Sequence, residues 1–287
     1  MNENYIGRDG DQIKIVILNV QNIKHHISDI KHHHVLHDQN LLIFSETWLS
    51  ITDLNDANHP YKIPGYEANY CIAGNGKGIV GYADKTFQPE QDIVRESHQI
   101  IKYSTSFQHK SGKNVFVDVI GVYRSTRSSN DNTLLSDIKR MIDFSRVCLI
   151  SGDFNLDVRK QSNNVILKEL RDMKFTQMID YPTHVQGGII DHLHVFCPKT
   201  YNNVMIESDL IAPFYSDHFG ICINIYKGEN TFKHIASSVP DDLIQPVDSL
   251  HETRTPSRKW GQTTFTSNKT SKRKRAGSPE KSKPQNQ

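Results

Sequence analysis

Residues 147–155 read Val-Cys-Leu-Ile-Ser-Gly-Asp-Phe-Asn, and this stretch carries the sharpest local signal in the sequence. Its apolar beginning predicts a buried strand. Gly152 then allows the backbone to approach a neighbouring segment closely, and Asp153 and Asn155 would face the same side of an extended chain. Because an isolated Asp or Asn after a strand is more often a turn former than a functional group, the stretch indicates a site only if other strands end in the same way.

Other predicted strands do end in carboxylate or amide side chains, and one ends in a histidine. The set comprises Asn19, Glu46, Asp153 with Asn155, Asp191, and Asp217 with His218. Open sheets place ligands at the ends of their strands, and clusters of carboxylate and amide oxygens suit hard cations such as Mg²⁺ or Mn²⁺. The recurrence therefore favours one metal-binding site over several unrelated turns.

Many strand-like runs with few helices between them predict a layered α/β protein. The runs lie at residues 13–20, 41–44, 66–73, 78–82, 100–107, 115–123, 147–150, 189–196, 204–207 and 220–225. A first helix follows residue 20, and apolar residues at helical spacing predict two more at about 132–144 and 163–173. We expect a four-layer α/β sandwich, in which two packed mixed β-sheets are flanked by helices.

The predicted domain spans residues 13–227 and lies between two segments that we expect to be disordered, residues 1–12 and the basic tail, residues 228–287. Residues 251–287 contain ten Lys or Arg and two Glu, a charge of +8, so the net charge of +2 leaves −6 for the rest of the chain. The run Lys-Arg-Lys-Arg at 272–275 is compatible with a nuclear localisation signal, a nucleic-acid-binding arm or a solubilising tail. We expect an intracellular, nuclear protein.

Several classes of protein are not indicated. No apolar run approaches the roughly 18 to 20 residues of a membrane span, and the polar N-terminus does not resemble a secretory signal. The four cysteines form no C-x-x-C pair, so they are expected to be reduced, buried thiols rather than zinc ligands. We expect no membrane partner.

The ordered set of motifs resembles the endonuclease/exonuclease/phosphatase superfamily, whose fold is like that of deoxyribonuclease I. In chain order the matching strings are Leu18-Asn19-Val20-Gln21-Asn22, Ser45-Glu46-Thr47-Trp48, Gly121-Val122-Tyr123-Arg124, Gly152-Asp153-Phe154-Asn155, Ile190-Asp191-His192 and Ser216-Asp217-His218. The resemblance covers about residues 10–227. The Ser-Glu-Thr-Trp string, and Pro182-Thr183-His184 followed by a glycine pair, look most like the endonuclease domains of non-LTR retrotransposons.

The resemblance implies a metal site. Glu46 would bind Mg²⁺ or Mn²⁺ directly, and Asn19 and Asp217 would complete the oxygen shell, partly through water. Gln21 departs from the family pattern, because it stands where an Asp or Asn often helps to organise this site. Its longer amide still offers an oxygen, but with a different geometry, so the metal affinity is in question.

The resemblance also implies catalytic roles. Asp153 would orient or deprotonate the attacking water, and Asn155 would donate a hydrogen bond to the phosphate or to that water. His218 would contact the phosphate while Asp191 accepts its ring N–H and favours the imidazolium. The hydroxyl of Tyr123 would donate to the developing charge.

Two further residues are expected to bind the substrate. Thr183 begins the loop 183–188 and Arg124 begins the loop 124–130, and both loops carry donors or small residues near the inferred phosphate site. For every residue of the set, the alternative is a hydrogen-bonded polar side chain that lies at a strand end and has no function in catalysis or binding.

We therefore expect a divalent-metal-dependent phosphodiesterase, first of all a DNA endonuclease that nicks one strand, acting as a monomer with no obligate protein partner. RNA or a non-nucleic phosphate ester such as a phosphoinositide is the alternative substrate, because the motifs report phosphate hydrolysis and not what the phosphate carries. A non-catalytic binding module of the same fold is the third hypothesis.

Two features suggest other functions but are weaker. Six histidines lie on or beside the first predicted helix, and His33 with His37 has the spacing of a zinc pair; the apolar stripe of this helix would leave most of them in solvent. The stretch 74–78, Gly-Asn-Gly-Lys-Gly, lacks the spacing of a nucleotide-binding loop, so we expect a hairpin turn there.

Overall fold

The structure is a computed structural model that describes residues 12–55, 60–72, 77–108, 114–126, 130–201, 203–213 and 215–227. The chain divides into two compact units, Met1–Ile244 and Gln245–Gln287, and the second lies wholly outside the described residues. The two predicted disordered segments, apart from residue 12, and most of the predicted turn at 74–78 also lie outside them. Among the described helices, none is long and apolar enough to cross a membrane.

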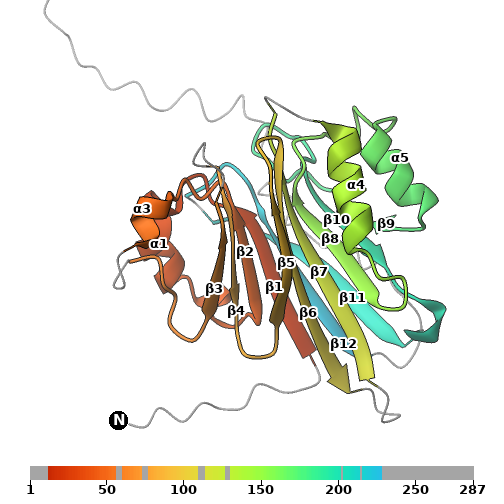
Figure 1. Ribbon diagram of the computed structural model, residues 1–287, viewed down its shortest axis with the longest axis horizontal. Helices are drawn as coiled ribbons and strands as arrows, with labels where there is room; N and C mark the ends of the chain where they lie inside the picture. Colours follow the sequence, from red (N-terminus) through yellow and green to blue (C-terminus); the bar gives the residue numbers. More distant parts are fainter. Residues whose placement is uncertain are drawn as a thin grey trace, which may run out of the picture. The chain divides into compact units, whose positions relative to one another are not determined.

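The described chain forms two six-stranded mixed sheets (Figure 1). The first has the order β11-β12-β1-β2-β4-β3 and consists of β1 (Gln12–Asn19), β2 (Leu41–Ser45), β3 (Glu67–Cys71), β4 (Ile79–Ala83), β11 (Val204–Ile211) and β12 (Gly220–Lys227). The second has the order β5-β6-β7-β8-β10-β9 and consists of β5 (Gln88–Val94), β6 (His98–Gln108), β7 (Asn114–Arg124), β8 (Val147–Asp153), β9 (Thr176–Gln177) and β10 (Asp191–Phe196). In each sheet one pair of central strands, β1 with β2 and β7 with β8, is parallel.

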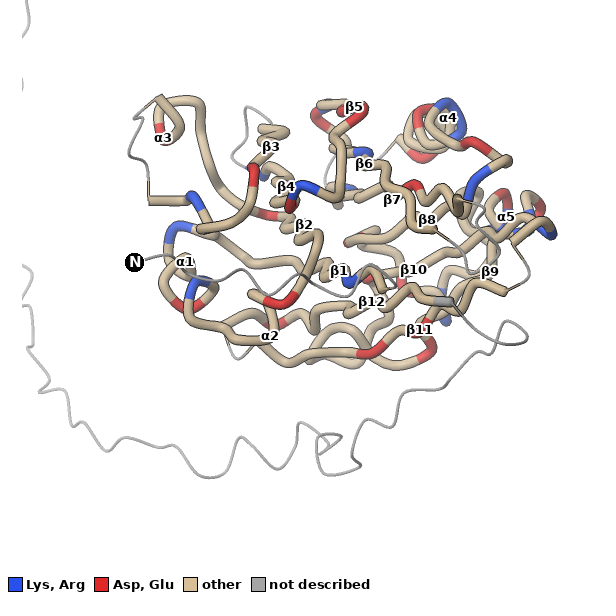
Figure 2. The backbone as a smooth tube through the Cα atoms, turned by 90° about the horizontal axis from the view of Figure 1, so that it is seen from below, with Lys and Arg blue, Asp and Glu red and all other residues tan. Residues whose placement is uncertain are grey.

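Helices cover the outer faces of both sheets. The helical segments are α1 (Ile23–His32), α2 (His34–His37), α3 (Ile51–Leu54), α4 (Asp131–Met141), α5 (Val165–Asp172) and the 3₁₀ turn η1 (Lys199–Tyr201). Apolar residues of α1 and α2 pack on the first sheet, and those of α4 and α5 pack on the second. In Figure 2, α2 and α4 lie on opposite sides of the strands. The predicted four-layer sandwich is confirmed.

The central core lies between the two sheets and explains the uninterrupted apolar run of β1. Ile13, Ile15 and Ile17 face this interior. Val16 and Leu18 lie on the opposite side of the strand, in the cluster that α1 and α2 cover. A strand buried on both faces needs apolar residues at successive positions rather than alternation, and each such side chain contributes about 1.5 to 3 kcal/mol by its burial. The site is thus mounted on rigid strands.

One predicted helix boundary was wrong, and one strand was not predicted. Helix α4 ends at Met141 rather than at residue 144, and its N-cap is Asn130, whose side chain accepts from the backbone N–H of Thr133. Strand β5 was not predicted at all. It is an edge strand whose residues are nearly all exposed, so it lacks the apolar alternation that identifies a strand in a sequence.

Candidate active site

The register of the second sheet places three predicted site residues side by side. Strands β7 and β8 pair Tyr123 with Asp153, and strands β8 and β10 pair Asp153 with Asp191. Side chains of directly opposed residues lie on the same face of a sheet. Tyr123, Asp153 and Asp191 therefore project together from one end of this sheet.

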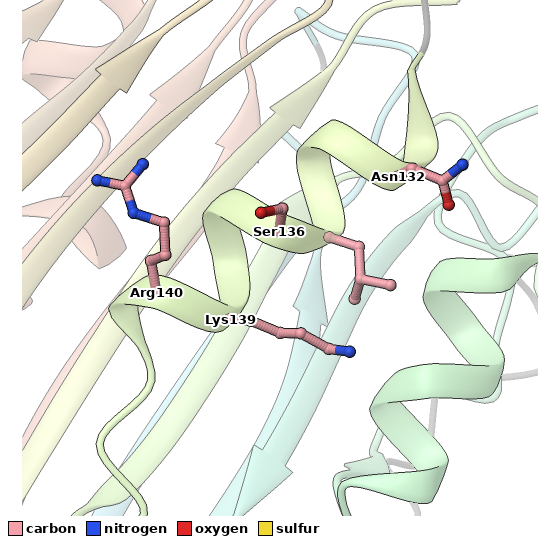
Figure 3. A pocket seen from close by; sticks show the side chains of 5 residues that line it. Asn132, Ser136, Lys139 and Arg140 are labelled. Carbon is pink, nitrogen blue, oxygen red and sulfur yellow. The ribbon is translucent and has the colours of Figure 1, made fainter.

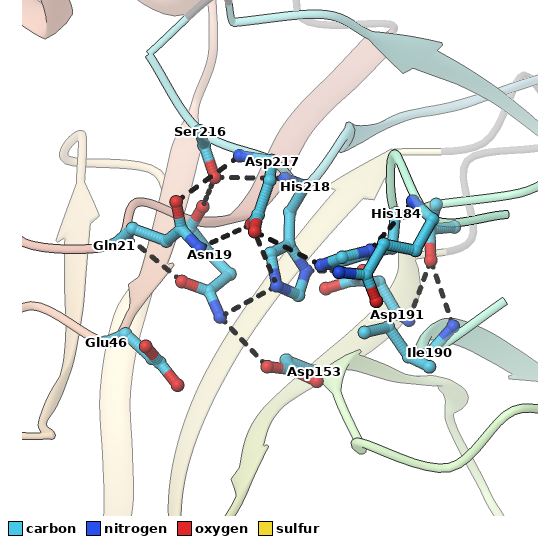
Figure 4. Close-up of polar contacts among 12 residues, drawn as sticks. Asn19, Gln21, Glu46, Asp153, His184, Ile190, Asp191, Ser216, Asp217 and His218 are labelled. Atoms are coloured by element: carbon cyan, nitrogen blue, oxygen red, sulfur yellow. Dashed lines mark hydrogen bonds and ion pairs between the residues drawn. The ribbon is translucent and has the colours of Figure 1, made fainter. Parts of the chain in front are cut away.

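The first sheet brings its own polar residues to the same place. Strands β1 and β2 pair Asn19 with Ser45, the residue before Glu46. Strand β12 is antiparallel to β1, so residues 216–218, which precede it, lie beside the carboxyl end of β1. The hydroxyl of Ser216 donates to the backbone oxygen of Asn19 at 2.7 Å. Figure 4 shows the resulting cluster, to which both sheets contribute.

Gly152 allows β7 and β8 to approach each other just before Asp153. Its φ is +139°, and a Cβ atom placed there would lie 1.9 Å from the backbone oxygen of Val122. Only glycine adopts this conformation without strain. The glycine of the Gly-Asp-Phe-Asn string therefore has a structural function, which is to set the position of the following carboxylate.

Both oxygens of the buried Asp153 carboxylate are hydrogen-bonded, although the residue is only 1% exposed. Oδ1 accepts from the backbone N–H of Asn155 at 2.8 Å. Oδ2 accepts from Nδ2 of Asn19 at 2.9 Å and from Nδ2 of Asn155 at 3.1 Å. Burial, followed by the charge of Asp191, raises the pKa of Asp153 to about 7. An oriented carboxylate that exchanges its proton near neutral pH is suited to accept a proton from water.

His218 is held by Asp191, since its Nδ1 lies 2.9 Å from Oδ2 of that carboxylate. Burial alone would lower the pKa of His218, but the hydrogen bond to Asp191 and the surrounding carboxylates raise it to about 9. The ring is therefore an imidazolium at neutral pH. Its Nε2 lies 3.4 Å from Nδ2 of Asn19, which is a contact between two donors rather than a hydrogen bond when the ring is protonated. Nε2 is thus able to donate to an anion.

Glu46 lies at the edge of the cluster nearest to β4 and β7. Its φ is +50°, an unusual conformation for a residue with a side chain and one that often marks functional sites. Oε1 accepts from the hydroxyl of Tyr123 at 2.8 Å and from Nζ of Lys77 at 3.0 Å. Among the described residues no group donates to Oε2. One oxygen of Glu46 is therefore anchored and the other is open.

Gln21 links Asn19 to Asp217. Its backbone N–H donates to Oδ1 of Asn19 at 3.0 Å, and its side-chain amide donates to Oδ1 of Asp217. The backbone N–H of Asp217 lies 3.4 Å from Oε1 of Gln21, and Nε2 of His184 lies 3.3 Å from Oδ2 of Asp217. The longer amide that departs from the family pattern thus reaches across the site and positions this carboxylate.

The oxygen set suits a divalent cation. The open Oε2 of Glu46 is joined by Oδ1 of Asn19, which accepts one hydrogen bond and keeps a second lone pair, and by the partly exposed carboxylate of Asp217. Figure 4 shows Glu46 pointing toward the region that Asn19 and Asp153 also face. Carboxylate and amide oxygens are the ligands that Mg²⁺ and Mn²⁺ prefer.

Two compact groups that include His218 fit an ion less well. One contains His184 and Asp217, and the other contains Asp153 and Asp191. In both, Nδ1 of His218 is already bonded to Asp191, and a protonated ring has no lone pair to offer. The oxygen set is therefore the better candidate metal site.

Comparison with known structures agrees with this architecture. The truncated Caenorhabditis elegans TDP2 superposes with a TM-score of 0.53, at 13% sequence identity over 76% of this chain and 99% of that chain. The endonuclease domain of TRAS1, a telomere-specific non-LTR retrotransposon, gives a TM-score of 0.53 at 14% identity over 76% and 100%. An endonuclease/exonuclease/phosphatase family protein from Leptotrichia buccalis gives 0.52 at 13% identity over 74% and 99%.

The chain has the endonuclease/exonuclease/phosphatase fold. No protein-family model and no curated protein matches the sequence. At such low identities the similarity establishes the fold, and the assignment of residues to roles depends on the geometry described above.

Within this fold, the two predicted substrate-binding residues are occupied by protein contacts. Thr183 is 0% exposed, and its hydroxyl accepts from the N–H groups of Ile190 and Asp191 at 3.0 and 2.9 Å. Arg124 is buried, donates to Asp131 at 2.8 Å and donates to the backbone oxygen of Phe154 at 3.1 Å. Both residues hold the loops of the site in place. A direct contact with the substrate stays a prediction and would require these bonds to rearrange.

Asn155 is similarly engaged. Its φ is +49°, and the two hydrogens of its amide point to the backbone oxygen of Arg124 at 2.8 Å and to Oδ2 of Asp153. Its amide thus contacts the carboxylate of Asp153 and the backbone of Arg124, and its predicted hydrogen bond to phosphate or water stays a prediction.

Lys77 and His184 also contact the cluster. Neither was predicted as a site residue, because both lie in turn-like stretches and meet the site only through contacts distant in sequence. Among the described residues, no group of three or more potential metal ligands includes the histidines of α1 and α2. His26 instead stacks on Tyr215 at a centroid distance of 5.1 Å. The four cysteines are free.

The fold carries an open hollow elsewhere. It is lined entirely by residues of α4, including Asn132, Ser136, Lys139 and Arg140 (Figure 3). Lys139 bonds to Glu169 of α5 at 2.7 Å. None of its lining residues belongs to the polar cluster, so this hollow is separate from the candidate active site.

Proposed function

We propose that this protein is a divalent-metal-dependent phosphodiesterase that nicks one strand of DNA. One observation carries the proposal: a buried, doubly anchored Asp153 lies in the same strand-end cluster as the His218–Asp191 pair and the open oxygen of Glu46. Hydrolysis of a phosphodiester needs an acceptor for the proton of water, a donor for the charge on phosphate and a site for a cation.

Asp153 serves as the proton acceptor. Its hydrogen bonds from Asn19 and Asn155 fix the carboxylate plane, so that water is oriented without reorganisation of the site. Its pKa of about 7 allows the deprotonated form to be present at neutral pH while the carboxylate retains enough basicity to accept a proton.

His218 serves as the donor to the phosphate. Asp191 fixes the ring through Nδ1 and favours its protonated form. Nε2, which lies 3.6 Å from Oδ1 of Asp217 in this structure, would donate to a non-bridging oxygen. A positive charge that is already in place stabilises the additional negative charge of the transition state. Tyr123, on the strand beside Asp153, donates to Glu46 and so connects the second sheet to the segment that carries this metal-binding carboxylate.

Glu46, Asn19 and Asp217 would hold Mg²⁺ or Mn²⁺, which when bound polarises the phosphate and stabilises the leaving oxygen. The chain's contribution is to preorganise these ligands. Gln21 restrains both Asn19 and Asp217, and Tyr123 anchors Glu46 through Oε1, so that Oε2 is left for the cation.

Two considerations favour DNA as the substrate. One similar structure is the endonuclease domain of a non-LTR retrotransposon, and residues 251–287 carry a charge of +8 that would be attracted to a phosphate backbone. RNA and non-nucleic phosphate esters remain the alternative, because the cluster recognises the phosphate and not its substituents. Nuclear localisation through the basic run remains a prediction.

The test is the cleavage of supercoiled plasmid with Mg²⁺, with Mn²⁺ and with EDTA, in parallel with single-stranded RNA and soluble inositol phosphates. We expect metal-dependent conversion of supercoiled plasmid to the open circle, without early linear product. A protein that hydrolyses only inositol phosphates would have the proposed chemistry on another substrate. Absence of hydrolysis on all three would favour a binding module.

A further inference from the structure

The ammonium group of Lys77 contacts the carboxylate of Glu46. Nζ of Lys77 lies 3.0 Å from Oε1 of Glu46 and 3.3 Å from the hydroxyl of Tyr123. The ammonium also lies 5.7 Å from the centroid of the Trp48 ring and 5.9 Å from that of Tyr123. One carboxylate, one hydroxyl and two aromatic faces thus surround a single positive charge, an environment that stabilises cations.

The backbone builds this environment. The N–H of Thr47 donates to the backbone oxygen of Gly78, the residue after Lys77, at 3.1 Å, so the segment bearing Glu46 is bound to the segment bearing the lysine. Both Glu46 and Trp48 have positive φ values, +50° and +55°. Positive φ is rare for a bulky residue such as Trp, and Trp48 adopts it although the residue is 42% exposed. The arrangement is specified by the fold rather than by burial of the indole.

The charges of the pair compensate each other in a partly buried setting. The side chains of Lys77 and Glu46 are 24% and 16% exposed. A carboxylate so far removed from water is stabilised by a close positive charge. When a divalent cation binds the same carboxylate, the ammonium becomes a like charge at short distance, and the two repel.

We propose that Lys77 is an internal counter-cation of Glu46, which holds Oε1 of the carboxylate in place before metal binds and with which a divalent ion at Oε2 competes for the charge of the carboxylate. This inference rests on the metal site of the proposed function and extends it. Lys77 thereby sets the concentration of divalent ion that the site requires. A positioning residue of this kind preserves the ligand geometry in the empty site at the cost of lower metal affinity.

The experiment measures metal binding directly. Mn²⁺ alone is titrated by calorimetry into the full chain, into Lys77→Met and into Lys77→Arg, without nucleic acid. We expect Lys77→Met to bind Mn²⁺ about tenfold more tightly, as removal of a like charge from a partly exposed site predicts, and Lys77→Arg to bind it no more tightly than the wild type. Lys85→Met is the matched control, because this exposed lysine follows the opposite end of β4 and its loss changes the net charge equally.

Two further variants show whether the effect passes through Glu46. In a Glu46→Gln background, Lys77→Met should no longer change Mn²⁺ affinity, since the competition has lost its carboxylate. In EDTA, Lys77→Met should unfold at a lower temperature than the wild type, and Mn²⁺ should raise its Tm by more than it raises that of the wild type.

An unchanged or weaker Mn²⁺ affinity of Lys77→Met would overturn the inference, as would an absence of measurable Mn²⁺ binding to any of these proteins. These results differ from a failure of the proposed function. Tighter binding by Lys77→Met in a protein that cleaves no DNA would uphold the counter-cation and refute the nuclease. Cleavage of plasmid by the wild type, together with unaltered Mn²⁺ affinity in Lys77→Met, would uphold the nuclease and refute the counter-cation.

Discussion

Oδ2 of Asp153 accepts a hydrogen bond at 2.9 Å from Nδ2 of Asn19, a residue 134 positions earlier in the chain and in the other β-sheet. The bond joins the carboxyl ends of β1 and β8, the central strands on which the site is built. It means that the orientation of the buried carboxylate depends on how the two sheets pack. Changes that disturb this packing should affect the site even when they alter none of its charged groups.

Replacement of Gly152 by Ala should be such a change. The added Cβ would meet the backbone oxygen of Val122 at 1.9 Å, and the φ of +139° disfavours any residue but glycine. We expect a loss of about 2 kcal/mol or more in the free energy of unfolding, as for other overpacked or strained positions. Gly187→Ala is the control, because φ is also positive there but nothing lies within 4 Å of the added atom. Urea unfolding of the two variants measures the difference, and equal losses would show that steric contact is unimportant at Gly152.

Replacement of Asp191 by Asn should lower the pKa of His218. The hydrogen bond and charge of Asp191 oppose the effect of burial and raise this pKa to about 9, so the wild-type ring stays protonated through neutral pH and loses its proton near pH 9. Without the carboxylate, burial prevails and deprotonation moves to lower pH. NMR titration of the His218 ring in metal-free protein follows this directly, with exposed His25 as internal reference. An unchanged titration of His218 would contradict the pairing.

Replacement of Gln21 by Ala should weaken divalent-ion binding. Gln21 restrains Asp217 through its amide and Asn19 through its backbone, and the variant loses only the first contact. We expect an increase of about tenfold in the Mn²⁺ concentration needed for half saturation, since loss of a partner that orients a ligand typically costs ten- to a hundredfold in affinity. If Gln21→Ala binds Mn²⁺ as tightly as the wild type, the amide does not organise the ligand set.

Acid should selectively remove the contribution of Asp53 to stability. Hydrogen bonds from Lys24 and Ser50 lower the pKa of Asp53 to about 2 in the folded protein. A folded-state pKa below the unfolded value stabilises the protein at higher pH, and this stabilisation is lost as pH falls from about 4 to about 2. Asp53→Asn should therefore lower the Tm at pH 7, with the difference from wild type shrinking across that range. A difference independent of pH would show that the carboxylate charge is not what matters.

How much of the site the sequence could predict depends on how local each signal is. The stretch around Asp153 combines a buried strand, a glycine and two polar residues within nine positions, so its geometry depends on neighbouring residues in the sequence. Strand β8 ends at Asp153, which therefore lies at a strand end as predicted. The resemblance supplied the order of the other motifs. The four-layer arrangement followed from the number and spacing of apolar runs.

Contacts that depend on tertiary structure could not be read in the same way. Lys77 stands in a glycine-rich stretch that indicates only a turn, and its bond to Glu46 spans 31 positions. The contact between Gln21 and Asp217 spans 196 positions of the chain. The motif around Gln21 shows only that this residue departs from the family pattern, not which distant residue it contacts. Strand β5 was not predicted because an exposed edge strand has no alternation of apolar and polar residues.

The single-strand cleavage of supercoiled plasmid by Asp153→Asn tests the central claim most directly. The substitution preserves size and keeps one oxygen for hydrogen bonding but removes the carboxylate proposed to accept the proton, and Asp209→Asn, at an exposed position of β11, is the matched control. We expect Asp153→Asn to slow Mg²⁺-dependent nicking by about a hundredfold or more, as loss of a general base does, while its circular dichroism spectrum and the nicking rate of Asp209→Asn stay at wild-type values. Wild-type nicking rates in a folded Asp153→Asn protein would contradict this claim.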